Sequence, residues 1–416
     1  MPSGIHRSSR PRVAVCLVLS AGLASWLGTT LLSAAPPVRD DRHIASRDVW
    51  SWQALKQRNV VMQKRDYSCG AAALATILRY HFGDPVTEDQ VLRVLDELLT
   101  VEDAMAACEE VYLMHARDSV QWSNPPAFKM DTAEGFNNHW HVKAALLKEI
   151  PTTGVRLYNY YDDGVRNTVG ALNCTRYVVL SDPHTGHALA IVDEHWTYAI
   201  RSTAAAIAPL KWMGPLDRSK PLVLGLVGIG TMGTNALRCL LTLYRFSEIR
   251  CTSRRPETRA AFCAKWSKEL GIPVVAKTTI EEVVRGADIA VGGTTSSDIV
   301  SRGAWLKPGA TFVSLARREL DPADWASMDK VVIDSWTFNI IQKEFKKMVE
   351  SGQFTREQLH AEIQEVIAGT KPGREREDER ILVHTTGIVS QDVAIAHLVY
   401  EKAKARGMGI PLPAAG

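Results

Sequence analysis

Three glycines, Gly228, Gly230 and Gly233, form the pattern that points most directly to chemistry. Residues 221–227 before them are apolar, as in a buried strand, and residues 234–243 after them follow a helical pattern. A strand, a glycine turn and a helix in this order place backbone amides and a positive helix end where the pyrophosphate of a dinucleotide binds. The predicted contacts are Gly228, Gly230, Thr231, Met232 and Gly233.

The next predicted strand, over residues 248–253, ends about twenty residues beyond the third glycine, where an acidic residue would bind the ribose of NAD. Here the chain reads Ser253, Arg254 and Arg255. A hydroxyl and two guanidiniums accept a 2′-phosphate, whereas a carboxylate would repel it. The sequence therefore favours NADP(H), with NAD(H) as the alternative. A second interpretation is that the arginines are only solvent-exposed residues of a loop.

A third predicted strand runs from residue 287 and ends in small hydroxylated residues, of which Thr295 and Ser296 are candidate cofactor contacts. Strands and helices alternate throughout this region, which predicts a parallel sheet with covering helices. Upstream, the pattern predicts a helix over 101–112, two strands over 176–192 joined by a turn at 182–186, and one long helix over 194–213.

Length and composition limit the remaining possibilities. A chain of 416 residues, 46% of them hydrophobic, predicts two or three globular domains. The formal charge of +3 comes from 49 basic and 46 acidic side chains spread along the sequence, so nucleic acid is not an expected partner. The seven cysteines form no CxxC pair, which excludes a zinc knuckle and fits a reducing compartment.

The N-terminal 35 residues point to a different compartment. Three arginines precede an uncharged run over 13–32 and small residues at 33–35, the pattern of a signal peptide or membrane anchor. A mis-assigned start codon is the alternative. Because NADP(H) is a cytoplasmic cofactor, we expect a cytoplasmic catalytic region.

Residues 36–87 form a short segment of another kind. Cys69 stands just before a helical pattern with Gln63 six residues ahead, so a helix start would lower the thiol pKa and the amide would face an oxyanion. Residues 48–86 resemble the opening of papain-like C39 peptidases. The histidine and aspartate that such enzymes need do not follow. We therefore expect Cys69 to be a relic of a truncated domain.

From residue 88 to residue 416 the chain is similar to the ornithine cyclodeaminase and mu-crystallin family. The similarity rests on several motifs in family order: residues 181–213, the glycine turn, residues 305–310, residues 373–374 and residues 386–396. It implies an α/β fold in which a Rossmann-type, doubly wound NAD(P)-binding domain is inserted into an α+β domain for substrate binding and dimerisation. The implied domains are residues 216–384 for the former and residues 88–215 plus 385–416 for the latter.

The resemblance also implies an active site in the cleft between these domains of a homodimer. Arg201 would bind the substrate carboxylate, Ser202 a cofactor phosphate, and Asp392 would lie beside the nicotinamide. A guanidinium that holds a carboxylate through two hydrogen bonds would fix Cα for hydride transfer. The alternatives are an interhelix salt bridge for Arg201 and an N-terminal helix charge for Asp392.

The chain departs from the family pattern at three places. Ala127 stands where an arginine is common, and Arg156 replaces the usual lysine. Arg156 can bind a carboxylate but cannot shuttle a proton, so proton transfer must come from elsewhere. Residues 311–321 lack the aspartate of cyclodeaminases, and this region looks more like the dehydrogenases of N-substituted amino acids, such as those that form diaminopropionate.

Three further features carry less weight. His139 and His141 lack a third ligand at fixed spacing, so no metal is expected. Lys143 is interpreted as a solvated helix lysine rather than a cation of the substrate cleft. His195 is either a proton donor near the cofactor or a residue at a helix start.

These observations predict an NAD(P)-dependent oxidoreductase that acts on the C–N bond of a small amino or imino acid held by Arg201 and Arg156. One alternative is an ammonia lyase of the ornithine cyclodeaminase kind with bound NAD. The other is a protein of the mu-crystallin kind that binds NADPH or a small ligand without catalysis.

Overall fold

The computed structural model describes residues 97–131, 138–161, 176–294, 296, 298–315 and 319–409, with short stretches before residue 97. Contacts divide the chain into residues 1–58 and residues 59–416. In the first unit, β1 (Pro37–Arg39) pairs antiparallel with β2 (Ile44–Ser46). The predicted anchor and most of the peptidase-like segment lie outside the described residues. Within the described residues, no helix has the length and apolar character needed to cross a membrane.

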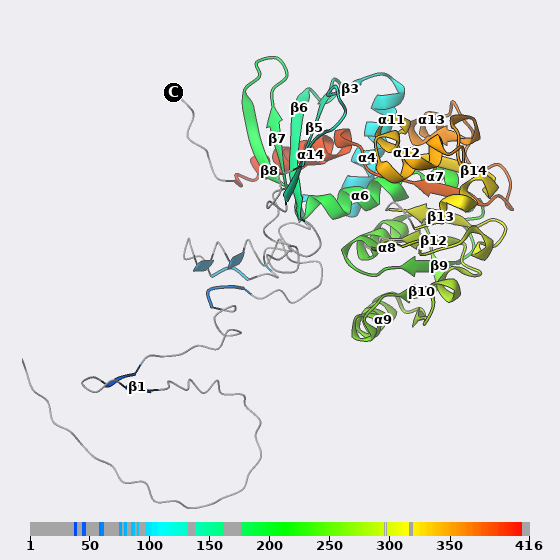
Figure 1. The fold of residues 1–416 in the computed structure, drawn as a ribbon, viewed down its shortest axis with the longest axis horizontal. Helices are drawn as coiled ribbons and strands as arrows, with labels where there is room; N and C mark the ends of the chain where they lie inside the picture. Colours follow the sequence, from blue (N-terminus) through cyan, green and yellow to red (C-terminus); the bar gives the residue numbers. More distant parts are fainter. Residues whose placement is uncertain are drawn as a thin grey trace, which may run out of the picture. The chain divides into compact units, whose positions relative to one another are not determined.

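An eight-stranded sheet of parallel pairs is the centre of the larger unit (Figure 1). Its order is β11-β10-β9-β12-β13-β16-β14-β15. All residues of β12, β13, β14 and β16 are buried, as expected for a sheet covered on both faces. Chain order reverses between β9 and β12, and ligands bind at such switch points. The strands are β9 (Leu222–Val227), β10 (Phe246–Thr252), β11 (Val274–Ala276), β12 (Ile289–Gly292), β13 (Thr311–Ser314), β14 (Lys330–Ile333), β15 (Ala361–Glu362) and β16 (Ile381–His384).

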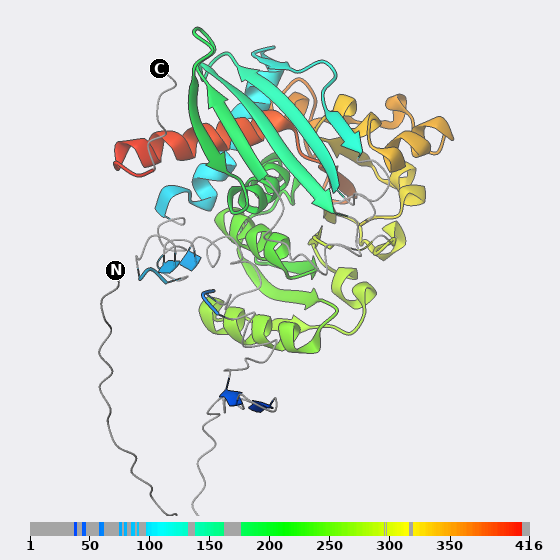
Figure 2. The same ribbon diagram turned by 60° about the vertical axis from the view of Figure 1, so that its left-hand side comes forward.

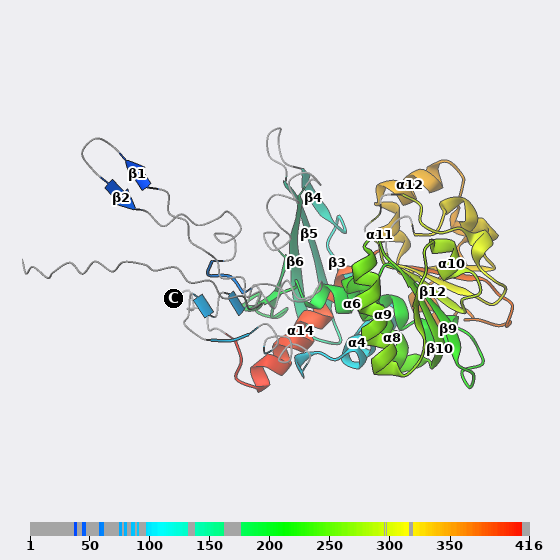
Figure 3. The ribbon, with the colours of Figure 1, turned by 90° about the horizontal axis from the view of Figure 1, so that it is seen from below.

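Helices cover this sheet, with α8 and α9 on one face and α10 on the other (Figure 3). Local signals fix their ends: α9 starts with Pro256 and stops at Gly271, whose φ is +68°, and Thr279 caps α10 together with Glu282. The helices are α8 (Thr231–Leu243), α9 (Pro256–Leu270), α10 (Ile280–Val284), α11 (Trp336–Ile340), α12 (Lys343–Glu350) and α13 (Ile363–Ile367), with 3-10 turns η2 (Gly303–Trp305), η3 (Pro322–Ser327) and η4 (Arg356–Gln358).

A second, antiparallel sheet lies beside the first (Figure 2). Its order is β3-β5-β6-β7-β8, with β4 paired to β5. Helix α14 (Val389–Ala405) packs across β5, β6 and β7, and α6 (Thr197–Ile207) contacts α4 (Val101–Ala116), α8 and α14. The C-terminal helix therefore closes a sheet built from residues far earlier in the chain. The strands are β3 (Val120–Trp122), β4 (Phe128–Asp131), β5 (Asn138–Leu147), β6 (Thr152–Tyr161), β7 (Arg176–Ser181) and β8 (Ala188–Asp193).

The predicted fold class is confirmed, as are the helix after residue 100 and the β7–β8 hairpin. The single helix over 194–213 is wrong. Helix α6 ends at Ile207 and α7 (Leu210–Met213) follows, because Pro209 has no amide hydrogen to continue the helix. The boundaries at 215/216 and 384/385 stay predictions, since residues 59–416 group as one compact unit.

Candidate active site

The glycine turn is locked by backbone contacts. Gly228 has φ of +93°, and a Cβ on it would lie 2.5 Å from the carbonyl oxygen of Gly293, which follows β12. A Cβ on Gly233 would overlap the carbonyl oxygen of Gly228. The turn after β9, the start of α8 and the loop after β12 therefore meet at the switch point without side chains between them.

Gly230 is different, because it faces open space. A Cβ there would meet no atom within 4 Å, and its φ of −72° suits any residue. Gly230 is the N-cap of α8 and provides no side-chain hydrogen bond to the helix. The first amides of the helix, including those of Thr231 and Met232, therefore face the open space beside Gly230, here called the cradle. This combination of free amides, a helix start and room for an anion fits the pyrophosphate of a dinucleotide.

The predicted ribose site lies next to this turn, since the amide of Gly228 donates to Thr252 O at the end of β10. Ser253 is half-buried, and its hydroxyl donates to Arg255 O at 3.3 Å. Arg254 and Arg255 are exposed. Sequence reasoning missed Arg259, whose Nη1 donates to Ser253 O at 2.6 Å and adds a third cation on the first turn of α9.

At the carboxyl ends of β12 and β13, Thr295 lies outside the described residues. The hydroxyl of Ser296 accepts from the Asp298 amide at 3.1 Å and so closes a local turn. The structure adds Glu319, a buried carboxylate that accepts from the amides of Thr294 at 2.7 Å and Leu315 at 2.6 Å. Glu319 ties the two strand ends together, and nothing in the sequence distinguishes it from a solvated loop residue.

A pocket of about 270 Å³ separates α6 from this edge of the sheet. Arg201, the predicted carboxylate ligand, and Ser202, the predicted contact of a cofactor phosphate, line it from α6, and residues after β13 and β16 line the other side. Gly387 has φ of +83°, and a Cβ on it would lie 2.5 Å from Arg201 Nη1. The lining residues are Tyr198, Arg201, Ser202, Ala205, Leu315, Thr385, Thr386 and Gly387.

Behind this pocket is a group of buried charges, here called the charge cluster: Lys143, Arg156, Glu194, Arg201 and Asp392. Arg201 Nη2 lies 2.5 Å from Asp392 Oδ1, and Arg156 Nε lies 2.7 Å from both Glu194 oxygens. Arg156 Nε also lies 3.7 Å from Asp392 Oδ2. Arg201 Nε and Arg156 Nη2 are buried and have no hydrogen-bond partner among the residues that the structure describes. Both arginines therefore retain donors for a further acceptor.

The charges of the cluster do not balance. Burial raises the pKa of Glu194 above its ordinary value, although Arg156 opposes this. Burial would also raise the pKa of Asp392, but Arg156 and Arg201 hold it below its ordinary value. The three basic residues Lys143, Arg156 and Arg201 thus face two acidic ones within the cluster, while the nearby Asp334 is bonded to the amides of Thr386 and Gly387. One more carboxylate, such as the α-carboxylate of an amino acid, would compensate the excess.

Asp334, another buried carboxylate, holds the loop that faces Arg201. It accepts from the amides of Thr386 at 2.8 Å and Gly387 at 2.6 Å, and from Asn339 Nδ2 at 2.8 Å. Sequence reasoning missed this residue because an aspartate after a strand looks like an ordinary helix cap. Its role in the structure is to position the pocket wall.

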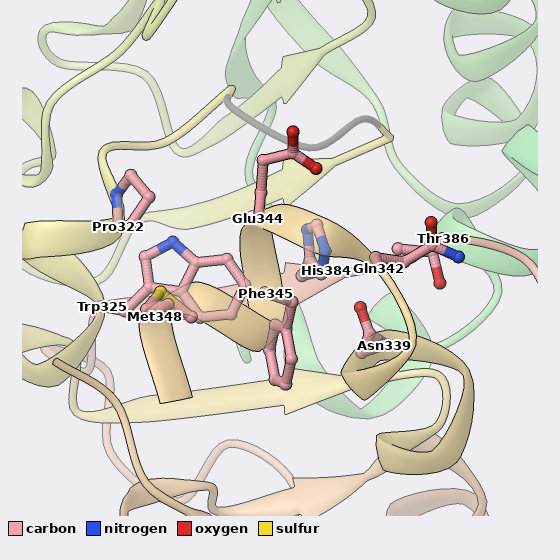
Figure 4. A pocket seen from close by; sticks show the side chains of 9 residues that line it. All are labelled: Pro322, Trp325, Asn339, Gln342, Glu344, Phe345, Met348, His384 and Thr386. Atoms are coloured by element: carbon pink, nitrogen blue, oxygen red, sulfur yellow. The ribbon is translucent and has the colours of Figure 1, made fainter. Parts of the chain in front are cut away.

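A second recess, of about 340 Å³, adjoins the first, and Thr386 lines both (Figure 4). Figure 4 shows Phe345 and His384 lying between Trp325 on one side and Asn339 on the other. The ring of Trp325 meets those of Phe345 and His384 at centroid distances of 6.0 and 4.9 Å. This recess offers an apolar, aromatic space beside the pocket of Arg201.

The interpretation of Lys143 as a solvated helix lysine is wrong. Lys143 lies on β5 and is 7% exposed, because its strand is covered by α14. Asp392 lies in the first turn of α14, as predicted, but is buried against both arginines. His195 pairs with Asp193 before α6, and His141 on β5 contacts the hydroxyl of Tyr158.

A parallel sheet with a glycine turn at its switch point defines the class of dinucleotide-binding proteins, and a pocket at the same sheet's carboxyl edge is lined by the buried Arg201. Residues 88–407 match the model of the ornithine cyclodeaminase/mu-crystallin family, and the chain belongs to this family.

Relatives within the family include dehydrogenases and reductases. The N-((2S)-2-amino-2-carboxyethyl)-L-glutamate dehydrogenase of Staphylococcus aureus is 25% identical over 238 residues, which are 56% of this chain and 70% of the relative. A structure of an archaeal alanine dehydrogenase dimer with bound NAD is 26% identical, with a TM-score of 0.67 over 77% of this chain and 96% of that one. The iminosuccinate reductase of Paracoccus denitrificans in complex with NAD⁺ is 26% identical, with a TM-score of 0.65 over 76% and 95%.

Proposed function

We propose that this enzyme reduces the C=N bond of a small α-imino acid, or oxidises the corresponding amino acid or N-substituted amino acid. The observation that carries the proposal is the unbalanced charge cluster behind the pocket of Arg201. An α-carboxylate in this pocket would lie beside Arg201, whose Nε is a partnerless donor, and would supply the missing negative charge next to Arg156. The similar iminosuccinate reductase and alanine dehydrogenase act on molecules that carry such a group.

The chain's residues would bind and orient the substrate. Bound NAD(P)H would supply the hydride. Arg201 would hold the carboxylate end in the pocket between α6 and the sheet's carboxyl edge, the edge at which the cofactors of such sheets bind. The apolar recess beyond Thr386 is the space for the substrate's side chain or N-substituent.

The preferred cofactor of this proposal is NADP(H). Exposed Arg254 and Arg255, with Arg259 behind them, present positive charge where a ribose 2′-phosphate would lie. The similar solved structures hold NAD, so NAD(H) is the alternative that a direct affinity comparison would identify.

A homodimer is part of the proposal. The outward face of the antiparallel sheet carries Val155, Tyr177, Leu189 and Ile191, each more than one third exposed. The partner we infer is a second copy of this chain, since the similar alanine dehydrogenase structure is described as a dimer. Sedimentation equilibrium of Ile191→Lys against the unchanged chain tests it: a shift toward monomer supports the interface, and an unchanged dimer contradicts it.

Cyclodeamination is the alternative within the family. Glu319 stands near the position where cyclodeaminases present an aspartate, but its oxygens accept from two loop amides and so hold the backbone. This favours simple reduction or oxidation. The membrane anchor, the relic status of Cys69 and a cytoplasmic catalytic region remain predictions from the sequence.

The test uses the full chain with NADPH and a panel of cyclic and linear α-imino acids, followed at the absorbance of the reduced cofactor. Consumption of NADPH with an imino acid is the expected result. Ammonia release from ornithine without net change in the cofactor would instead indicate the lyase. Tight NADPH binding without turnover of any imine would indicate a binding protein.

A further inference from the structure

Reduction of a C=N bond needs a proton on nitrogen as well as a hydride on carbon. The two arginines of the charge cluster cannot supply it, because a guanidinium does not titrate near neutral pH. Burial raises the pKa of Glu194 to about 7, but both of its oxygens are bonded to Arg156 Nε, and Asp392 is held ionised by both arginines. The proposed function therefore leaves the source of the proton open, and the following inference rests on that function.

Lys143 is the remaining titratable group of the cluster. It stands directly opposite Arg156 in the antiparallel pairing of β5 with β6, so both side chains leave the sheet on the same face. This is the face covered by α14, which carries Asp392. The lysine is thus placed beside the carboxylate site by strand register alone.

The surroundings of its ammonium group are unusual. Nζ lies 5.1 Å from the ring centroid of Phe338 and 6.0 Å from that of Tyr158. Among the described residues no hydrogen bond or ion pair to Nζ is present, although the side chain is 7% exposed. Burial of a cation that has no ion pair shifts its protonation equilibrium toward the neutral amine, so the ammonium gives up its proton more readily.

Charged groups act on Lys143 from β6, α6, α14 and the segment after β14. Burial is the main cause that lowers its pKa to about 8, and Arg156 on β6 and Arg201 on α6 lower it further. Asp392 on α14 and Asp334 after β14 act in the opposite direction. The group therefore exchanges its proton close to neutral pH, as general acid–base catalysis requires.

We propose that Lys143 is the proton donor to the imine nitrogen in reduction and the base that removes this proton in oxidation. In reduction, the carbon of the C=N bond gains the hydride from the cofactor and the π electron pair moves to nitrogen. Nitrogen then takes one proton from the Lys143 ammonium, which becomes a neutral amine. Water returns the proton to Lys143, so atoms and charges balance.

Two other buried groups are less suitable. His115 is bonded to Ser390 at 2.8 Å, and burial lowers its pKa to about 4, so it is neutral at physiological pH. Tyr112 donates to Ala205 O, and burial raises its pKa well above the ordinary value. Each is fixed in one protonation state near neutral pH.

The test compares Lys143→Met and Lys143→Arg with the unchanged enzyme and with Lys148→Met, an exposed lysine after the same strand. We expect both Lys143 variants to lose about 10²–10⁴-fold in kcat, while the affinity for NADPH and the Lys148→Met control stay unchanged. Arginine keeps the charge, so a Lys143→Arg enzyme with ordinary kcat would overturn the proposal in favour of charge alone.

A second readout does not depend on turnover. In protein labelled with [ε-¹³C]lysine, one signal that is lost in Lys143→Arg should titrate near pH 8, and the pH profile of kcat should show the same group. An ordinary lysine pKa for this signal would overturn the proposal. If no imine is reduced by the unchanged enzyme, the proposed function fails, whereas an active enzyme that is insensitive to Lys143 contradicts only this inference.

Discussion

The glycine turn at the switch point of the sheet and the charge cluster beside the pocket of Arg201 are built in opposite ways. The turn is backbone alone: its shape comes from Gly228 and Gly233, where any side chain would collide with a carbonyl oxygen. The cluster is made of side chains from β5, β6, α6, α14 and the segment between β8 and α6, and its ion pairs join side chains.

This difference determines how each region responds to change. A turn of this kind tolerates altered charge nearby but not added volume. A buried charge cluster tolerates a change of shape better than the loss of one charge, because the partner is left unpaired in a dry site. Substitutions should therefore act on cofactor affinity in the first region and on stability and turnover in the second.

The largest effect is expected from breaking the cluster. Arg201→Met removes the 2.5 Å ion pair of Asp392 and leaves the longer 3.7 Å contact to Arg156, which should cost about 3–5 kcal/mol of unfolding free energy. Urea unfolding measures this. The double variant Arg201→Met/Asp392→Leu should be more stable than Arg201→Met, and additive losses would show that the two residues are not coupled.

Lys143 provides the opposite case, a charge whose removal stabilises. Lys143→Met should raise the unfolding free energy at pH 7 by about 1–4 kcal/mol, because it removes a buried ammonium without a partner. The pKa of Lys143 is lowered from 10.5 to about 8 in the folded protein. Between about pH 8 and pH 10.5 this lysine is therefore protonated in the unfolded chain and neutral in the folded protein. The stability of the unchanged protein relative to Lys143→Met should therefore rise over this pH range; a difference independent of pH would argue against the assignment.

In the glycine turn, Gly230→Ala isolates the effect of volume. Alanine fits the φ of Gly230 and meets no protein atom, so the melting temperature should not change. The added methyl group occupies the cradle, and the affinity for NADPH should fall at least tenfold, about 1.4 kcal/mol. Gly271→Ala, at an exposed helix end, is the control for binding. An unchanged affinity of Gly230→Ala for NADPH would show that the turn does not bind the cofactor.

The smallest effect is expected at the exposed arginines. Arg254→Gln together with Arg255→Gln should weaken NADPH binding by about 1 kcal/mol and leave NADH unaffected, because these side chains are solvated. Fluorescence titration with both cofactors, at low and high salt, measures the difference. Equal losses for NADPH and NADH would contradict a 2′-phosphate site.

The same contrast explains what the sequence could predict. The turn over 228–233 and the β7–β8 hairpin are contiguous, so local patterns were sufficient. Lys143 was misread because its burial depends on pairing with β6 and on cover from α14, which begins at residue 389. Asp334 and Glu319 were missed because their partners are loop amides from other strands, at Gly387 and at Thr294 and Leu315. Local periodicity does not show which strands pair, or which distant element buries a side chain.

The central claim is that the charge cluster binds an α-carboxylate and thereby positions a C=N bond for reduction. The most direct test is the kcat/KM for NADPH-dependent reduction of 1-pyrroline-2-carboxylate and of 1-pyrroline, which lacks only the carboxylate. We expect the carboxylate to be favoured on the order of 10⁴-fold, because its absence leaves buried donors unpaired. Equal values for the two imines would contradict the account.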